Sequence, residues 1–200
     1  MNLSLDGFMS GPHGELDWHF ETWNDEMGEQ LLGQLDRADT LLLGRFTYEA
    51  MAKYWTTKPL APDFPRQDLA IADKMNRHTK LVFSKTRTDS IWNNTRFAFR
   101  NPGEEIKLLK RLSGKDIILF GSGSLVSAFI HSNLVDEYRL WIHPVVLGNG
   151  IPLFRNQKFP LNLELSGSVI FGSGVIMLNY RQEQEIKKVA SLRRQRVAKG

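Results

Sequence analysis

The chain has 200 residues, of which 42% are hydrophobic, and its formal net charge at pH 7 is +4. This length suffices for one compact domain with a continuous core, and no apolar run approaches the roughly 18 residues that a membrane-spanning helix requires. Because the sequence has no cysteine, it excludes a disulfide framework, a thiolate nucleophile and a cysteine-based zinc site. We therefore expect a soluble, cytoplasmic protein that does not bind membranes.

The positive charge is concentrated at the end of the sequence. Residues 181–200 carry a net charge of +5, which leaves about −1 for residues 1–180. A nearly neutral body lacks the basic face with which proteins bind nucleic acid. We therefore expect one domain over residues 1–181 and no nucleic-acid partner. Residues 182–200 are expected to form a basic tail that is solvated, frayed or disordered.

The first half of the sequence alternates short apolar runs with helical patterns. Residues 1–5 read as a strand that ends in a turn at Asp6 and Gly7, and a helix is expected to begin at Asn24 or Asp25 as its cap. The run 41–43 is too short and too uniformly apolar for an exposed strand, so we expect it inside a sheet. A helix after Gly44, a helix over 67–77 and a strand over 80–83 follow.

The second half of the sequence passes from the same alternation into a β-rich end. Strand–helix units that are followed by antiparallel strands predict an α/β fold with a mixed sheet and helices on both faces. The expected elements are one or two short strands near Trp92 and 97–99, a helix over 103–112, a strand over 116–120, a helix over 124–131, strands over 136–143 and 145–147, and a hairpin over 161–170 and 175–180.

Three apolar runs stop at small, polar or cationic residues that begin the next segment. Glycine lets the backbone approach a ligand closely, and the first amides and the dipole of a helix attract a phosphate group. In an open α/β sheet these features gather at the carboxyl ends of the strands, where nucleotides bind. The residues are Gly44, Arg45 and Thr47 after the first run, Ser84 and Lys85 after the second, and Gly121, Ser122, Gly123, Ser124 and Leu125 after the third.

The third segment, residues 121–125, is the candidate diphosphate site. Ser122 and Ser124 can cap the following helix or donate hydrogen bonds to phosphate oxygens. The spacing G-x-G-x-x-V lacks the third glycine of the dinucleotide-binding fingerprint, and no acidic residue follows at the expected distance. A glycine-rich turn that is capped by serine and binds nothing explains this motif alone equally well.

Cations in the first and second segments indicate a further phosphate group. Arg45 can form a charge-assisted fork to a phosphate monoester such as the ribose 2′-phosphate, and Thr47 can donate a hydrogen bond to it. Lys85, together with Ser84, can reach the same phosphate. Two independent cations favour NADPH over NADH as the cofactor, although Arg45 alone is also explained as a surface residue that solvates a helix end.

Together these motifs resemble the dihydrofolate reductase-like superfamily. Leu-Gly-Arg-x-Thr at 43–47 follows a buried strand, and Phe-Gly-Ser-Gly-Ser-Leu at 120–125 precedes a helix. The opening Ser-Leu-Asp-Gly at 4–7 and the block at 134–154, which ends in Pro-Val-Val-Leu-Gly-Asn-Gly-Ile-Pro-Leu-Phe, look like the riboflavin-biosynthesis reductase family. That family is the C-terminal domain of the bifunctional deaminase-reductase. The match covers residues 1–181 in order.

The resemblance implies a three-layer dihydrofolate reductase-like fold with a mixed, mainly parallel sheet, and a homodimeric NADPH-dependent reductase. In the family, the counterparts of the three strand-end segments contact the cofactor. The loop after the first strand, which contains Asp6, Asp17 and Trp18, faces the substrate and the nicotinamide. The substrate is 5-amino-6-(5-phosphoribosylamino)uracil or a related small heterocycle. The sequence has no cytidine-deaminase-type zinc motif, so we expect a stand-alone reductase.

Reduction by a hydride also needs a proton, and carboxylic acids are the candidates for its donor. A carboxyl group in a water-poor pocket has a raised pKa and can donate a proton. We take Asp6 and Asp17 as candidate catalytic residues, although a turn cap explains Asp6 at least as well. Trp18 can stack on a flat heterocycle or close the core. With Glu49, which lies further off, it is a candidate substrate-binding residue.

Two other functions remain open at this stage, and a metal site is not expected. The five histidines lack a metal-ligand spacing such as H-x-x-x-H. A true dihydrofolate reductase needs an acid on the first helix, where residues 24–26 offer carboxylates that capping explains better. A module that binds a dinucleotide without turnover has the same motifs, because a fold does not guarantee chemistry.

Overall fold

The structure is a computed structural model that describes residues 1–62, 64–157 and 160–182. The described chain forms two compact units. The continuous unit is Trp23–Ser132, and the discontinuous unit combines Met1–Thr22 with the chain from Asn133 onward. Apart from Gln182, the expected tail over 182–200 lies outside the described residues.

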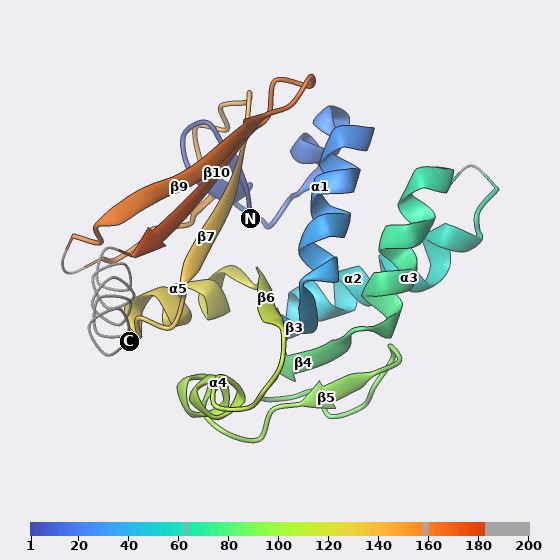
Figure 1. The fold of residues 1–200 in the computed structure, drawn as a ribbon, viewed down its shortest axis with the longest axis vertical. Coiled ribbons are helices and arrows are strands. Elements are labelled where there is room, and N and C mark those ends of the chain that lie inside the picture. The colour runs from blue at the N-terminus through green and yellow to red at the C-terminus, as the bar shows by residue number, and fades with distance from the viewer. Residues whose placement is uncertain (63, 158–159, 183–200) are drawn as a thin grey trace, which may run out of the picture. The chain divides into compact units, whose positions relative to one another are not determined.

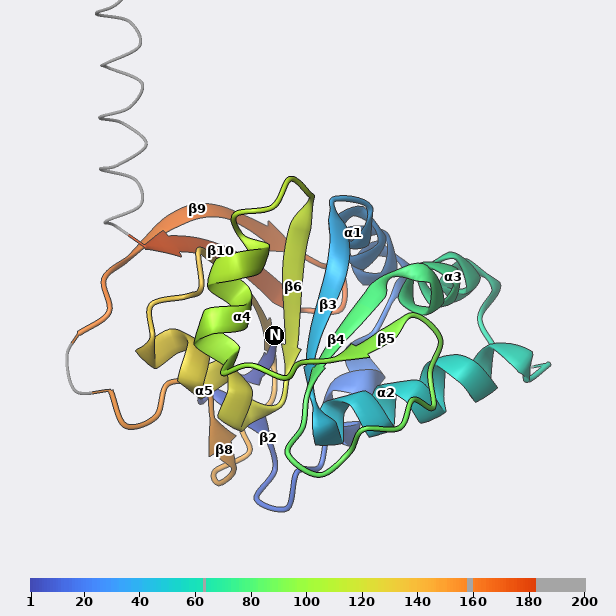
Figure 2. The same ribbon diagram turned by 90° about the horizontal axis from the view of Figure 1, so that it is seen from below.

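A four-stranded parallel sheet is the centre of the continuous unit (Figure 1, Figure 2), with the strand order β5-β4-β3-β6. At the ends of the strands, Gly44 of β3 pairs with Phe83 of β4, and Leu43 pairs with Gly121 of β6. Because all pairs are parallel, the carboxyl ends of the strands meet at one edge. The strands are β3 (Ala38–Gly44), β4 (Thr79–Phe83), β5 (Thr95–Phe97) and β6 (Asp116–Gly121).

Helices cover both faces of this sheet, as Figures 1 and 2 show. The core on the first face joins Leu41 and Leu43 of β3 to helix residues such as Leu35 and Met75. On the other face Phe83 meets Phe129, with their ring centroids 6.1 Å apart. The first face carries α1 (Asp25–Asp36), α2 (Arg45–Thr57) and α3 (Leu69–Arg77), and the second carries α4 (Pro102–Leu109) and α5 (Gly123–His131); η2 (Lys58–Leu60) and η3 (Arg66–Asp68) are short 3-10 turns.

Tyr48 fixes the segment before β5 to the first core. Its side chain is fully buried, and its hydroxyl accepts hydrogen bonds from the amides of Ile91 and Trp92, at 3.0 and 3.1 Å. Burial of an aromatic ring contributes about 2 kcal/mol to folding. The hydroxyl contributes further, because the amides would otherwise lack an acceptor inside the protein.

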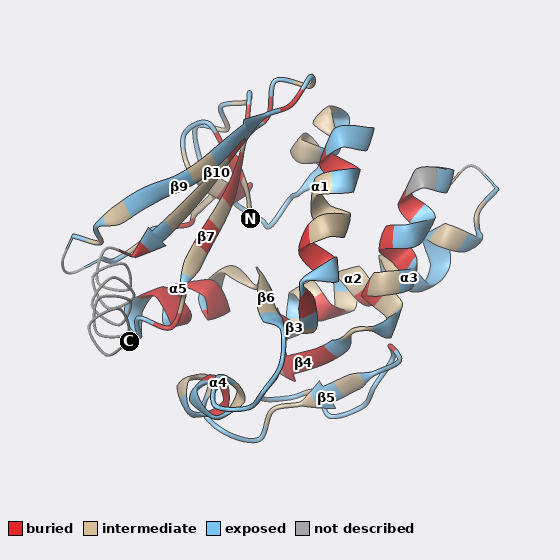
Figure 3. Ribbon diagram, in the orientation of Figure 1, coloured by how far each residue is buried: buried red, intermediate tan, exposed pale blue. Residues whose placement is uncertain are grey.

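The discontinuous unit holds a mixed sheet with the order β1-β7-β10-β9 and a separate pair of strands, β2 and β8. β1 and β7 are parallel, whereas β7, β10 and β9 are antiparallel. Figure 3 shows β7 largely buried and β9 largely exposed. The elements are β1 (Asn2–Ser4), β2 (Phe8–Ser10), η1 (Asp17–Thr22), β7 (Glu137–His143), β8 (Ile151–Pro152), β9 (Leu163–Ile170) and β10 (Ile176–Gln182).

The predicted α/β class, the helices on both faces of a parallel sheet and the C-terminal hairpin are confirmed. The strand expected over 145–147 is wrong, because the amide of Leu147 donates to the Asp6 side chain instead of to a strand. The two short strands β2 and β8 were missed by the sequence patterns, since each has too few residues to show an alternation. None of the described helices is long and apolar enough to cross a membrane.

Candidate functional site

The three strand-end segments predicted from the sequence lie together at the carboxyl edge of the parallel sheet. β3 stands between β4 and β6 in the sheet, so Gly44 has Phe83 beside it on one side and the end of β6 on the other. Arg45, Ser84 and Ser122 each follow directly on one of these strand ends. The edge of the continuous unit therefore brings all ten predicted cofactor-binding residues into one region.

Two glycines allow the segments after β3 and β6 to touch. A Cβ atom on Gly44 would lie 2.9 Å from the backbone nitrogen of Ser122 and closer still to its hydroxyl oxygen. A Cβ atom on Gly121, whose φ is 135°, would lie 2.9 Å from the hydroxyl oxygen of Thr47. The Gly121–Ser122 peptide bond is cis. Both positions require glycine, because any larger residue would push the two segments apart.

In the two helices that begin at this edge, α2 and α5, no side chain of the cap residue accepts a hydrogen bond from the first amides. Gly44 is the cap residue of α2 and Ser122 that of α5, and neither makes a side-chain cap hydrogen bond. The Ser122 hydroxyl lies 3.2 Å from that of Ser124 instead. By contrast, Asn24 caps α1 and Asn101 caps α4. Two adjacent helix starts thus keep their amides and positive dipole ends available to an anion.

Arg45, in the first turn of α2, adds a cation to this edge. Its guanidinium carbon lies 4.2 Å from the ring centroid of Phe46, which is itself 67% exposed. Its nearest acidic atom is a carboxylate oxygen of Glu49, at 4.0 Å. The same oxygen accepts a 2.9 Å hydrogen bond from Arg87. Glu49, predicted as a substrate-binding residue, is therefore committed to arginines beside the predicted cofactor residues.

Ser84 and Lys85 differ in how far the protein already uses them. The Ser84 hydroxyl accepts hydrogen bonds from the amides of Thr86 and Arg87, at 3.2 and 2.7 Å, and so fixes the turn after β4. Its own proton remains available for a ligand. Lys85 is exposed and makes no ion pair with any residue that the structure describes. Lys85 follows β4 and Arg45 follows β3, and these two strands are neighbours in the sheet. The ammonium group of Lys85 therefore suits a phosphate that is bound at this edge.

In the discontinuous unit, Asp6 is bound to the loop that follows β7. Its carboxylate accepts hydrogen bonds from the Ser4 hydroxyl at 2.6 Å and from the amides of Leu147 and Gly148, at 3.2 and 2.8 Å. The Ser4 hydrogen bond, followed by those from the two amides, lowers the pKa of Asp6. A carboxyl group with a lowered pKa is ionised over most of the pH range and holds no proton to give, so these contacts favour a structural role over the predicted acid role.

Trp18 lies in a group of rings, while Asp17 is exposed. The rings of Trp18 and His143 meet edge to face, with centroids 5.4 Å apart, and Trp18 meets His19 at the same distance. His143 is 1% exposed, and its Nδ1 atom lies 2.6 Å from the Thr22 hydroxyl. Burial, with His19 nearby, lowers the pKa of His143 to about 4. The role of His143 could not be predicted from the sequence, because a histidine at the end of a strand has no motif of its own.

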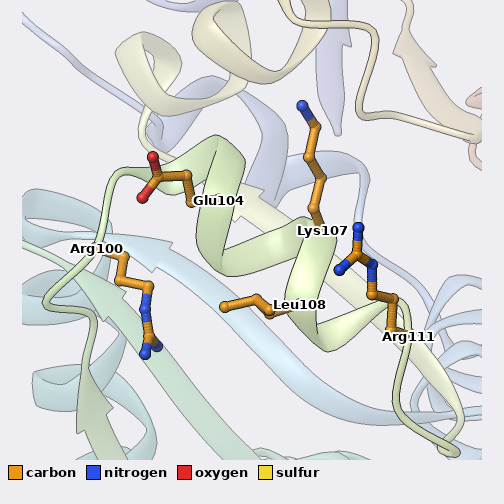
Figure 4. A pocket seen from close by; sticks show the side chains of 5 residues that line it. All are labelled: Arg100, Glu104, Lys107, Leu108 and Arg111. Atoms are coloured by element: carbon orange, nitrogen blue, oxygen red, sulfur yellow. The ribbon is translucent and has the colours of Figure 1, made fainter.

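A separate shallow groove of about 300 Å³ runs along α4 (Figure 4), lined by Arg100, Glu104, Lys107, Leu108 and Arg111. It contains none of the residues predicted from the sequence. Asn101 already accepts a hydrogen bond from the Gly103 amide at the start of α4, and four of the five lining side chains are charged. No group of three or more histidine, aspartate or glutamate side chains that could hold a metal ion exists among the described residues.

The family of the chain follows from comparison with known proteins. The RibD C-terminal domain model matches residues 1–177. The chain belongs to the RibD C-terminal domain family. The YyaP protein of Bacillus subtilis is 39% identical over 178 residues, which are 89% of this chain and 90% of YyaP.

Solved structures show the same fold at lower identity. A putative riboflavin biosynthesis protein from Shewanella sp. PV-4 is 22% identical, with a TM-score of 0.68 over 92% of this chain and 96% of that one. The diaminohydroxyphosphoribosylaminopyrimidine deaminase/5-amino-6-(5-phosphoribosylamino)uracil reductase of Thermotoga maritima is 14% identical, with a TM-score of 0.61 over 90% of this chain and 54% of that one. Dihydrofolate reductase from Enterococcus faecalis, complexed with NADP(H), is 14% identical, with a TM-score of 0.56 over 91% and 93%. The RibD C-terminal domain of this chain thus has the dihydrofolate reductase-like fold that the sequence predicted.

Proposed function

We propose that this chain is an NADPH-dependent reductase whose substrate is a ribosylamino-pyrimidine or a related small heterocycle. The observation that carries the proposal is the pair of uncapped helix starts, α2 and α5, which meet at Gly44 and Ser122 with Arg45 beside them. Amides and hydroxyls at two helix starts match a diphosphate, and an arginine next to them matches a phosphate monoester. NADPH carries both groups.

The residues of the carboxyl edge have separate roles in this proposal. The amides and hydroxyls of 121–125 hold the diphosphate, and Gly44 lets the backbone of α2 come close to it. Thr47, in the first turn of α2, donates a hydrogen bond to the phosphate monoester. Arg45 and Lys85, with the Ser84 hydroxyl, hold the 2′-phosphate. Their positive charges explain a preference for NADPH over NADH, because NADH has no group to pair with them.

When bound, NADPH supplies the hydride, so the chain has to hold the acceptor, exclude water and provide one proton. In the discontinuous unit Asp17 is the proposed proton donor and Trp18 the proposed stacking surface for a flat ring. Asp6 holds the loop at Leu147 and Gly148 in place. This loop belongs to the same unit as Asp17 and Trp18. We also infer that the active protein is cytoplasmic and that it is a homodimer, the latter because the resemblance to the reductase family implies it.

The proposed substrate class comes from the proteins whose structures resemble this chain. The Thermotoga protein is described as a deaminase and 5-amino-6-(5-phosphoribosylamino)uracil reductase, and the Shewanella protein as a putative riboflavin biosynthesis protein. A pyrimidine that carries a ribosylamino group is therefore the first substrate to test. Dihydrofolate is the second, since the fold is shared with dihydrofolate reductase.

The first experiment measures the melting temperature with NADPH and with NADH, because a ligand that binds the folded state stabilises it by mass action. We expect NADPH to raise the melting temperature more than NADH, and the variant Arg45→Ala to lose this difference. Oxidation of NADPH is then followed with the ribosylamino-pyrimidine and with dihydrofolate. Stabilisation by neither dinucleotide would contradict the proposal, and stabilisation without oxidation of NADPH would indicate a binding module.

A further inference from the structure

The carboxylate of Glu49 lies between two guanidinium groups at the proposed phosphate site. Its Oε1 atom accepts a 2.9 Å hydrogen bond from Nη1 of Arg87 and lies 4.0 Å from Nη1 of Arg45. The three side chains come from two elements, because Arg45 and Glu49 are one turn apart on α2, whereas Arg87 follows β4. An acidic side chain thus occupies the space between two cations where an anion would bind.

Arg87 is held in place from several sides. Its Nη2 atom donates to the Asp89 carboxylate at 2.8 Å, and its Nε atom donates to the Asp89 carbonyl at 3.2 Å. Its backbone amide donates to the Ser84 hydroxyl at 2.7 Å. The Arg87 side chain is 22% exposed. The Nη1 atom of Arg87 donates to Glu49 of α2, so this donor is held in position by the contacts with Asp89 and becomes available when Glu49 leaves.

The N–H groups of the Arg45 guanidinium are available to a ligand. Its side chain is 37% exposed and rests on the Phe46 ring, and its contact with Glu49 is too long for a hydrogen bond. A guanidinium group has five N–H donors in a planar fork, and none of those of Arg45 is hydrogen-bonded to a residue within the described ranges. The carboxylates of Glu49 and Asp89 balance the charges of Arg45 and Arg87, so the departure of Glu49 leaves this group of side chains with one positive charge to offset.

We propose that Arg45 and Arg87 form a two-arginine phosphate site and that Glu49 is its resident anion, which the phosphate monoester of the cofactor displaces. A phosphate monoester carries a charge of about −1.5 to −2 and three acceptor oxygens, so it binds two arginines better than a carboxylate does. A dinucleotide without this group cannot displace Glu49 and gains nothing from Arg87. Glu49 and Arg87 are therefore specificity-determining residues, an inference that rests on the proposed function.

The proposal predicts opposite effects for the two partners of one hydrogen bond. Glu49→Gln keeps the size of the side chain but removes the competing charge, so the phosphate monoester should bind more tightly. Arg87→Gln removes one of the two arginines and leaves Glu49 to neutralise Arg45, so the phosphate should bind more weakly. If Arg87 merely braced the loop after β4, breaking the pair from either side would change binding in the same direction.

The test is the ratio of the dissociation constants for NAD⁺ and NADP⁺, measured by calorimetry on the full chain at one ionic strength. We expect Glu49→Gln to raise the preference for NADP⁺ about tenfold and Arg87→Gln to lower it about tenfold, as for a hydrogen bond between charged groups. Arg87→Lys, which keeps the charge without the fork, should fall between the wild-type chain and Arg87→Gln. The matched control is Asp89→Asn, which removes the other carboxylate of Arg87 and should change the ratio less than about twofold.

Melting temperatures of all variants establish that they are folded. An unchanged or lowered preference in folded Glu49→Gln would overturn the inference by itself. If the wild-type chain prefers NADP⁺ while both variants keep its ratio, only the resident-anion inference fails. If the wild-type chain binds neither dinucleotide, the proposed function fails and this inference fails with it.

Discussion

The Asp6 carboxylate accepts a 2.8 Å hydrogen bond from the backbone amide of Gly148, so a residue near the start of the chain holds a loop that follows β7. The Ser4 hydroxyl and the Leu147 amide bind the same carboxylate. Gly148 has a φ of 72°, a conformation that other residues rarely adopt. The Ser-Leu-Asp-Gly motif and the Leu-Gly-Asn-Gly motif, which both belong to the family resemblance, are therefore two halves of one structural element.

This relationship predicts that Asp6→Ala lowers the melting temperature by several degrees, because three donors lose their acceptor. Since the folded-state pKa of Asp6 is lowered, its contribution is present above the ordinary pKa and is lost as the pH falls through the lowered value. Thermal melts of the wild-type and variant chains should therefore converge in acid. Asp17→Ala is the control, since Asp17 is exposed and makes no hydrogen bond to a described residue. A loss of turnover in Asp6→Ala at an unchanged melting temperature would instead indicate the predicted catalytic role.

His143 predicts a second pH dependence. Its folded-state pKa of about 4 lies below the ordinary value of 6.5, mainly because it is buried. The unfolded chain therefore takes up the proton first, and stability should be full above about pH 6.5 and fall as the pH is lowered toward 4. The measurement is the free energy of unfolding by urea across this range. His143→Gln should flatten the slope.

Tyr48→Phe tests the buried hydroxyl of the continuous unit. The substitution keeps the ring but leaves the amides of Ile91 and Trp92 without their acceptor. We expect it to lower the free energy of unfolding by about 2 kcal/mol. The control is Tyr54→Phe, because no hydrogen bond joins the Tyr54 hydroxyl to another residue in the described part of the chain. Equal losses from the two variants would contradict this account.

Gly44→Ala tests the close approach of α2 and α5. The added Cβ atom would lie 2.9 Å from the Ser122 nitrogen, which is backbone and cannot rotate away. We expect a loss of about 1–3 kcal/mol in stability and a reduced thermal shift with NADPH. Gly33→Ala in α1 is the matched control, because the nearest atom, on the Arg37 side chain, is 4.0 Å away. This second substitution should stabilise the chain by about 0.5–1 kcal/mol.

The edge of the parallel sheet was predictable from the sequence because its elements are local. β3, β4 and β6 each contain a short apolar run, and each run is followed directly by a glycine or a hydroxyl, with a cation close behind in two of them. Parallel pairing then brings Arg45, Ser84 and Ser122 to the same edge without further information. The N-cap of α1 at Asn24 was predictable for the same reason, since the capping oxygen and the Met27 amide are three residues apart.

Contacts between distant residues were beyond the reach of the patterns. Arg87 lies in a polar turn whose composition is ordinary, and its contact with Glu49 on α2 joins residues that are 38 positions apart. Asp6 read as a candidate acid because the sequence does not reveal that Leu147 and Gly148 donate to it. The aromatic group around His143 likewise depends on η1 and β7, which are more than a hundred residues apart.

The division of the chain into units sets an order for folding during synthesis. All residues of the continuous unit, Trp23–Ser132, are consecutive, so this unit can form as soon as its own segment has left the ribosome. β1 has to wait for β7, and Asp6 has to wait for Gly148. The opening segment therefore stays without its partners until most of the chain has been made, and its closure over a long loop is the step that we expect to limit the folding rate.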